Sequence, residues 1–149
     1  MINIRRAHRS EAEKIAQYQV LMAKESEGMK LDYETVLRGA NAVFDDSQKG
    51  FYLAAEYEGV IVGSLLITLE WSDWRAQTLY WIQSLYVEPA FRRKGVFRSM
   101  YKFLKDEIAE LGDIAGIRLY VDLGNTGAIR TYEALGMNGE HYQLFEDVL

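Results

Sequence analysis

The residues best suited to chemistry in this sequence are three consecutive cations, Arg92, Arg93 and Lys94, with Gly95 directly after them. They follow an alternating apolar run and the chain's only proline, Pro89, and a helical pattern begins at the glycine. A strand, a short loop and a helix start in this order direct backbone N–H groups and the positive end of the helix dipole at one spot. We therefore predict that this loop binds an anion such as a phosphate.

This concentration of positive charge contrasts with the acidic chain around it, whose formal net charge is −5. Six of the seventeen lysines and arginines lie between positions 92 and 105. For Lys102 and Lys105, farther along the helix, a solvated basic face is the simpler interpretation. The segment contains neither G-x-x-x-x-G-K-S/T nor G-x-G-x-x-G, so the predicted anion site is of another kind.

Hydrophobic periodicity places this loop among alternating strands and helices. Period-two patterns predict strands, and apolar residues at helical spacing predict helices. Strands are expected at 2–6, 51–57, 60–69, 78–87, 117–123 and 140–145, and helices at about 10–22, 32–40, 95–111 and 125–135. The order β-α-α-β-β-β-α-β-α-β predicts a mixed α/β fold around one central sheet, with a single domain over 1–149.

Composition narrows the class of protein. A pI near 5.1 argues against a broad basic face for nucleic acid, and no apolar run approaches the ~20 residues of a membrane span. The absence of cysteine excludes disulfides and thiolate chemistry and fits a reducing compartment. The charged start of the chain has no apolar core after it, so no signal peptide is expected. His8 and His141 are too isolated to suggest a metal site, and we expect a cytoplasmic protein that binds neither nucleic acid nor membrane.

Two segments together resemble the GCN5-related N-acetyltransferase (GNAT) superfamily. Residues 85–89 read L-Y-V-E-P and residues 92–97 read R-R-K-G-V-F, similar to the superfamily's strand end and its R/Q-x-x-G-x-G/A pyrophosphate loop. Residues 125–137 reproduce the pattern N-x-x-A-x-x-x-Y-x-x-x-G-M. Phe97 departs from the loop motif, because glycine or alanine is typical there, and its ring must turn away from the phosphates.

The resemblance covers nearly the whole chain and implies a fold and a cofactor. The fold would be a mostly antiparallel sheet of about six to seven strands flanked by about four helices. The cofactor would be acetyl-coenzyme A, with its pyrophosphate on the amides of 93–98 and its pantetheine arm along a strand edge. The implied cofactor-binding residues are Leu85, Tyr86, Val87, Arg92, Arg93, Lys94, Gly95, Val96, Phe97, Arg98 and Asn125. For Asn125 a plain helix N-cap is the alternative interpretation.

The resemblance also implies that Tyr132 acts at the sulfur of the cofactor. The alternative is a core tyrosine, since Ala128, Tyr132 and Leu135 share one helical stripe. A phenol has a pKa of ~10 against ~8.5 for a thiol, so complete proton transfer is uphill by ~2 kcal/mol. We therefore expect Tyr132 to donate a hydrogen bond to the developing thiolate, with protonation following or shared with water.

A general base is harder to find in the sequence. Trp81, Gln83 and Leu85 alternate on one face of the strand before the loop, where superfamily members often carry a glutamate or histidine, and none of them can take a proton. Glu70 is our candidate base, acting through water, with a solvated turn acid as the alternative. Asp73, Trp81 and Gln83 are candidates for substrate contact, while the density of aromatic residues from Trp71 to Tyr86 equally fits a core or an interface.

The function expected from this resemblance is transfer of an acetyl group to a primary amine by direct attack in a ternary complex. The acceptor would be a small molecule or a peptide, and a backbone N–H near Leu85 or Tyr86 would stabilise the oxyanion. A non-catalytic acyl-coenzyme A binding module is the first alternative, and a structural domain whose basic loop meets an acidic partner is the second. A homodimer is compatible with the aromatic residues, but no residue specifies it.

Overall fold

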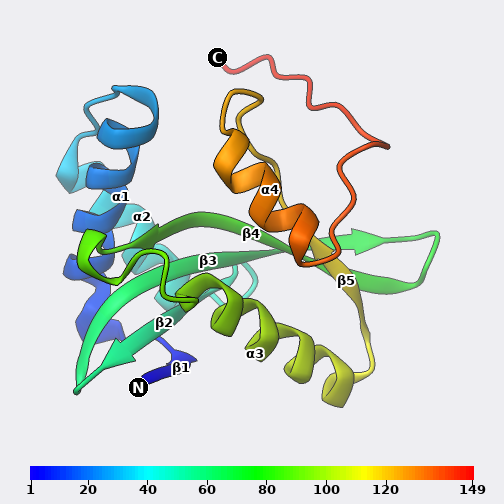
Figure 1. Ribbon diagram of the computed structural model, residues 1–149, viewed down its shortest axis with the longest axis horizontal. Coiled ribbons are helices and arrows are strands. Elements are labelled where there is room, and N and C mark those ends of the chain that lie inside the picture. Colours follow the sequence, from blue (N-terminus) through cyan, green and yellow to red (C-terminus); the bar gives the residue numbers. More distant parts are fainter. The chain divides into compact units, whose positions relative to one another are not determined.

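A computed structural model describes all residues, 1–149 (Figure 1). Its helices are α1 (Ala12–Glu27), α2 (Tyr33–Asp45), α3 (Val96–Leu111) and α4 (Thr126–Ala134), with single 3-10 turns at Arg9–Glu11 and Pro89–Phe91. Its strands are β1 (Ile2–Arg6), β2 (Phe51–Tyr57), β3 (Val60–Ser72), β4 (Gln77–Val87) and β5 (Ile114–Arg118). None of the helices is long and apolar enough to cross a membrane.

The chain divides into two compact units, Met1–Arg118 and Leu119–Leu149. In the first unit the strands lie in the order β1-β2-β3-β4-β5, antiparallel from β1 to β4 and parallel between β4 and β5. α1 and α2 pack on one face of this sheet and α3 on the other (Figure 1). The second unit contains α4. The left-handed Gly136 follows this helix, and the Met137 N–H donates to Tyr132 O at 3.0 Å.

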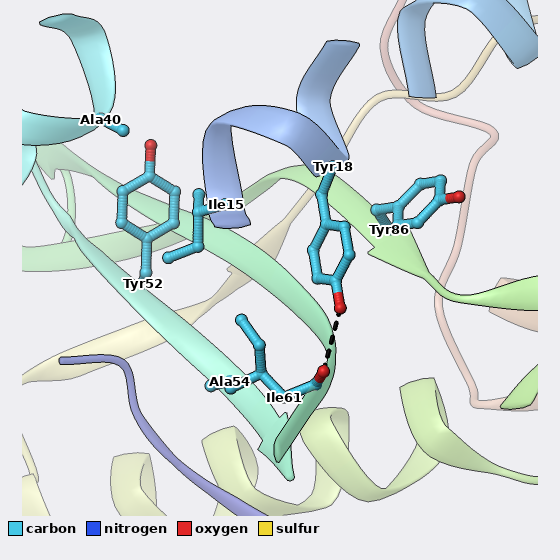
Figure 2. Packing of buried hydrophobic residues seen from close by; sticks show 7 residues of the cluster. All are labelled: Ile15, Tyr18, Ala40, Tyr52, Ala54, Ile61 and Tyr86. Atoms are coloured by element: carbon cyan, nitrogen blue, oxygen red, sulfur yellow. Dashed lines mark hydrogen bonds between the residues drawn. The ribbon is translucent and has the colours of Figure 1, made fainter. Parts of the chain in front are cut away.

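The core under α1 and α2 joins the first helix to the end of β4. Ile15 and Tyr18 of α1 pack with Tyr86 of β4, and the rings of Tyr18 and Tyr86 lie 4.9 Å apart (Figure 2). The Tyr18 hydroxyl reaches Ile61 O at 3.0 Å and a carboxylate oxygen of Glu88 at 2.6 Å. Burial, and then the hydrogen bond to Glu88, raise the pKa of Tyr18 well above its ordinary value, so the hydroxyl stays a donor. This bond ties α1 to the residue that follows β4.

The mixed α/β class, the central sheet and the element order through the last helix are confirmed. The sheet is smaller than expected, with five strands instead of six to seven. The fifth strand was placed too late, since it covers Ile114–Arg118 and not 117–123. The strand expected at 140–145 is absent, because an alternating pattern forms a strand only where it finds a pairing edge, and no ladder includes these residues.

Candidate functional site

A β-bulge in β4 shapes the strand that leads into the basic loop. Tyr86 pairs with Ser64 and Gln83 pairs with Leu66, so two residues of β4, Ser84 and Leu85, oppose one residue of β3. Ser84 has a left-handed φ of 53°, which is uncommon for a residue other than glycine. A bulge leaves its extra residue outside the ladder and bends the strand. The bulge is therefore a place where a backbone N–H is available to a ligand.

The bulge also changes which side chains share a face. Tyr80 reaches Glu107 of α3 at 3.4 Å, whereas Tyr86, six residues later, packs on Tyr18 of α1. In a regular strand, residues an even number apart point to the same face, so the extra residue has reversed the alternation. The expectation that Leu85 shares a face with Trp81 and Gln83 was therefore wrong, and Tyr86 takes that place.

The pairing between β4 and β5 stops before the bulge. The last parallel pair is Trp81 with Arg118, the final residue of β5. Beyond it, residues 82–87 of β4 have no β5 partner in the ladder, although all of them except the bulge residues Ser84 and Leu85 remain paired with β3. The opening therefore begins at Ile82. It leaves a length of strand edge that an extended ligand such as a pantetheine arm could follow.

The basic loop has the backbone conformation of an anion cradle. Arg93 and Gly95 are both left-handed, with φ values of 61° and 78°, and α3 starts directly after the glycine. The first bond of α3 runs from Ser99 N–H to Gly95 O at 3.0 Å, so the amides of residues 96–98 precede the helical ladder. A Cβ added at Gly95 would meet no atom within 4 Å. Open space, successive amides and the helix dipole fit a pyrophosphate at this loop.

Arg92, the first residue of the loop motif, binds the protein itself. Its Nε donates to Val87 O at 2.8 Å, and its Nη2 donates to a carboxylate oxygen of Glu25 on α1 at 2.8 Å. Its guanidinium also lies over the Tyr86 ring, 5.2 Å from the centroid. Arg92 thus braces the loop between α1 and the end of β4, and it uses one of the two acceptor positions of the Val87 carbonyl.

Phe97, the departure from the motif, turns along its own helix. Its ring lies 6.2 Å from the ring of Tyr101, one turn later. Arg93, Lys94 and Arg98 are exposed around the loop. Lys102 pairs with Asp106 at 2.7 Å, which agrees with a solvated role for that part of the helix.

In the second unit, the two motif residues of α4 have distinct local environments. Asn125 is the N-cap, and its Oδ1 accepts the Ala128 N–H at 3.1 Å. The side-chain NH2 of Asn125 can still donate to a ligand, so capping does not exclude a contact with the cofactor. Burial raises the pKa of the Tyr132 hydroxyl above its ordinary value, which keeps it a donor at neutral pH.

The remaining polar candidates form a row beside β4. Gln83 Nε2 donates to Thr68 Oγ1 at 2.6 Å, and Trp81 Nε1 donates to Glu70 Oε1 at 2.8 Å. The same Glu70 oxygen accepts from Arg118 at 2.9 Å. The bond from Trp81, and then the one from Arg118, hold the pKa of Glu70 below its ordinary value. Such a carboxylate is ionised but is a weaker base than a free one.

The register gives the spacing of these candidates from the bulge. Glu70 pairs with Leu79, five residues before Ser84, which corresponds to about 17 Å of strand. Asp73 lies farther away, exposed in the turn that joins β3 to β4, where Trp74 is also 86% exposed. Gln83 is adjacent to the bulge. The register therefore argues against direct contact of Glu70 or Asp73 with a group held at the bulge, and it favours Gln83.

Comparison with known proteins agrees with this geometry. Residues 13–137 match the Acetyltransferase (GNAT) family. This chain belongs to the GNAT family. A crystal structure of a possible acetyltransferase from Clostridium difficile 630 is 36% identical, with a TM-score of 0.92 over 100% of this chain and 98% of that chain.

More distant acetyltransferase structures share the fold alone. The ribosomal-protein-alanine N-acetyltransferase of Brucella melitensis biovar Abortus 2308 is 15% identical, with a TM-score of 0.79 over 99% of each chain. The glucosamine-6-phosphate N-acetyltransferase of Arabidopsis thaliana is 19% identical, with a TM-score of 0.71 over 99% of this chain and 98% of that chain. No curated protein matches the chain.

Two residues of this site were not identified from the sequence. Ser84 carries the bulge, but a serine in an alternating strand gives no signal of one. Glu25 lies 67 positions before the arginine that it binds, and only the packing of α1 on the sheet brings them together. No group of three or more potential metal ligands is found among the described residues.

Proposed function

We propose that this GNAT acetyltransferase uses acetyl-coenzyme A to acetylate a primary amine by direct attack in a ternary complex. The observation that carries the proposal is the continuity of one surface. Residues 82–87, which lack a β5 partner, contain the bulge at Ser84 and Leu85, and the cradle before α3 follows them along the chain. Backbone groups along a strand edge and amides at a helix start suit a pantetheine arm that ends in a pyrophosphate.

The residues of this surface fit acetyl-coenzyme A, whose thioester supplies the acetyl group when it is bound. In this proposal the amides of 93–98 hold the pyrophosphate, and Leu85 and Tyr86 present backbone groups to the pantetheine arm. The N–H groups at the bulge stabilise negative charge on the thioester oxygen as the amine attacks. Tyr132 donates a hydrogen bond to the departing sulfur, and the side-chain amide of Asn125 contacts the cofactor arm.

The proposed activity is tested by thiol release over an amine panel. The panel contains polyamines, amino acids, aminoglycosides and peptides with free amino termini, each with acetyl-coenzyme A. We expect at least one class to raise thiol release above the amine-free rate. We also expect coenzyme A at 100 times its Kd to stabilise the fold by about 2.7 kcal/mol. Thermal protection by coenzyme A without any amine-dependent thiol release would favour the non-catalytic binding module. Absence of thermal protection would refute the assignment of coenzyme A as the cofactor.

Replacing Glu70 by glutamine tests whether this residue is the general base. We expect kcat to stay within threefold of the unaltered protein, because about 17 Å of strand separates Glu70 from the bulge. The measurement is the initial rate with a saturating amine from the panel, alongside the melting temperature. A fall in kcat of tenfold or more at an unchanged melting temperature would establish Glu70 as the base instead.

A further inference from the structure

A pocket of about 390 Å³ lies between the second half of α1 and the end of β4. Met22, Glu25 and Ser26 line it from the helix, residues 85–87 line it from the strand, and Arg92 closes it from the loop. These strand residues are the ones that we place along the pantetheine arm and the thioester. Glu25 is the only acidic residue of the pocket.

Glu25 is oriented by its neighbours. Arg92 donates to the Glu25 carboxylate and to Val87 O, each at 2.8 Å, so a single guanidinium connects this carboxylate to the end of β4. The Tyr86 hydroxyl points away from Tyr18 (Figure 2). Burial, and then the negative charge of Glu25, raise the pKa of Tyr86, which indicates that carboxylate and phenol lie near each other. The carboxylate is therefore held beside the residues that follow the bulge.

We propose that Glu25 binds the acceptor, as the partner of the ammonium group of an alkylamine or of a peptide amino terminus. This inference rests on the proposed function. A carboxylate has about four acceptor positions, and the bond from Arg92 uses one oxygen, so an ammonium can bind as well. Met22 and Leu85, which line the same pocket, offer apolar surface to the carbon chain of the amine.

The same pocket disfavours amines that carry an anion next to the amino group. Glu25 repels a second negative charge, and so does a pyrophosphate on the adjacent loop. Arg92 is the only cation of the pocket, and its guanidinium is already engaged by Glu25 and Val87. A free amino acid is therefore a poorer acceptor than the amine with the same side chain.

Binding the ammonium is a separate task from deprotonating it. The pKa of a glutamic acid lies about six units below that of an alkylammonium, so complete transfer of the proton to Glu25 is strongly uphill. The ammonium equilibrates its proton with the bulk solvent, so that a fraction set by the pH is neutral amine. This neutral amine attacks the thioester carbon, and the bond from that carbon to the sulfur breaks. Glu25 is thus a specificity-determining residue.

The test uses three matched acceptors and two matched variants of the full chain. The acceptors are phenylethylamine, phenylalanine amide and phenylalanine, which differ in the group beside the amine. The variants are Glu25→Gln and, as a control on the same helix, Glu27→Gln, which removes one charge from an exposed acid outside the pocket. KM, kcat and the Kd of coenzyme A are measured for each protein.

We expect Glu25→Gln to raise the KM of phenylethylamine about tenfold, because the ammonium loses one charge-assisted hydrogen bond. Its kcat and coenzyme A Kd should stay within twofold, and Glu27→Gln should change nothing. Phenylalanine should be the poorest of the three acceptors for the unaltered protein. An unchanged KM, or a coenzyme A Kd that rises as much as the KM, would overturn the assignment, since Glu25 would then act only on the loop.

The inference can be separated from the proposed function. If coenzyme A binds but no amine is turned over, the proposed function fails. The site is then tested by titrating phenylethylamine into the coenzyme A complex in a calorimeter. A heat of binding that is lost in Glu25→Gln and retained in Glu27→Gln would support the amine site. Absence of a heat of binding with the unaltered protein would refute it.

Discussion

Replacing Gly95 by alanine will weaken coenzyme A binding at least thirtyfold. Gly95 has a φ of 78° and precedes the first residue of α3. A Cβ there enters the open space that we assign to the phosphates and disfavours the backbone conformation that directs the amides of 96–98. Loss of one charge-assisted hydrogen bond and about 1 kcal/mol of backbone strain together account for about 2 kcal/mol, which is a thirtyfold change. The measurement is calorimetric titration with coenzyme A.

The chain contains a matched control at the other end of the same helix. Gly112 has a φ of 75°, and an added Cβ would likewise meet nothing within 4 Å. Gly112→Ala should lower the melting temperature about as much as Gly95→Ala, because the backbone strain is of the same kind, yet leave coenzyme A affinity within twofold. Equal losses of affinity in both variants would show that binding depends on α3 as a whole and would refute the cradle.

Replacing Tyr132 by phenylalanine will lower kcat roughly a hundredfold, the size typical of losing a proton donor in the transition state. The Kd of coenzyme A should stay within twofold, since the phenol acts on the sulfur only as charge develops there. Single-turnover kinetics with a saturating amine from the panel separates this step from product release. Tyr142→Phe is the control, because Tyr142 belongs to the same unit and is 79% exposed.

The pH dependence gives Tyr132 a second readout. Burial raises the pKa of the Tyr132 hydroxyl above its ordinary value of 10.0, so the protonated, donating form persists to higher pH than in a free phenol. The ionisation of Tyr132 should therefore not lower kcat below pH ~10. Any fall in kcat of the unaltered protein below that pH should also be seen in Tyr132→Phe. An unchanged kcat in Tyr132→Phe would exclude Tyr132 from the mechanism.

The basic loop shows what local sequence can predict. Three cations before a glycine and a helix pattern indicated an anion cradle, and the left-handed conformations of Arg93 and Gly95 agree with it. The same reasoning did not reveal the bonds that Arg92 makes within the protein, because the partners of a long side chain depend on what lies within its reach. Glu25 and the Val87 carbonyl each accept a hydrogen bond from Arg92 at 2.8 Å.

The alternation of side chains along β4 shows where local reasoning fails. Regular alternation along β4 put Leu85 beside Gln83, and the bulge at Ser84 replaced it with Tyr86. A bulge depends on the pairing of two strands, and the sequence of one strand does not reveal it. Glu70 was chosen because it is an acid close to β4 along the chain, whereas the cross-strand register places it far from the bulge.

The sequence by itself determined the α/β order, the basic loop and the family, because each depends on residues close together in the chain. Turn chemistry, helix starts and hydrophobic periodicity act over a few residues, and the two motifs lie in such segments. Only the tertiary structure decided which strand edge is open, which face Tyr86 joins and that Glu25 meets Arg92 across 67 positions. These features follow from long-range packing and register, where one inserted residue reverses every side chain beyond it.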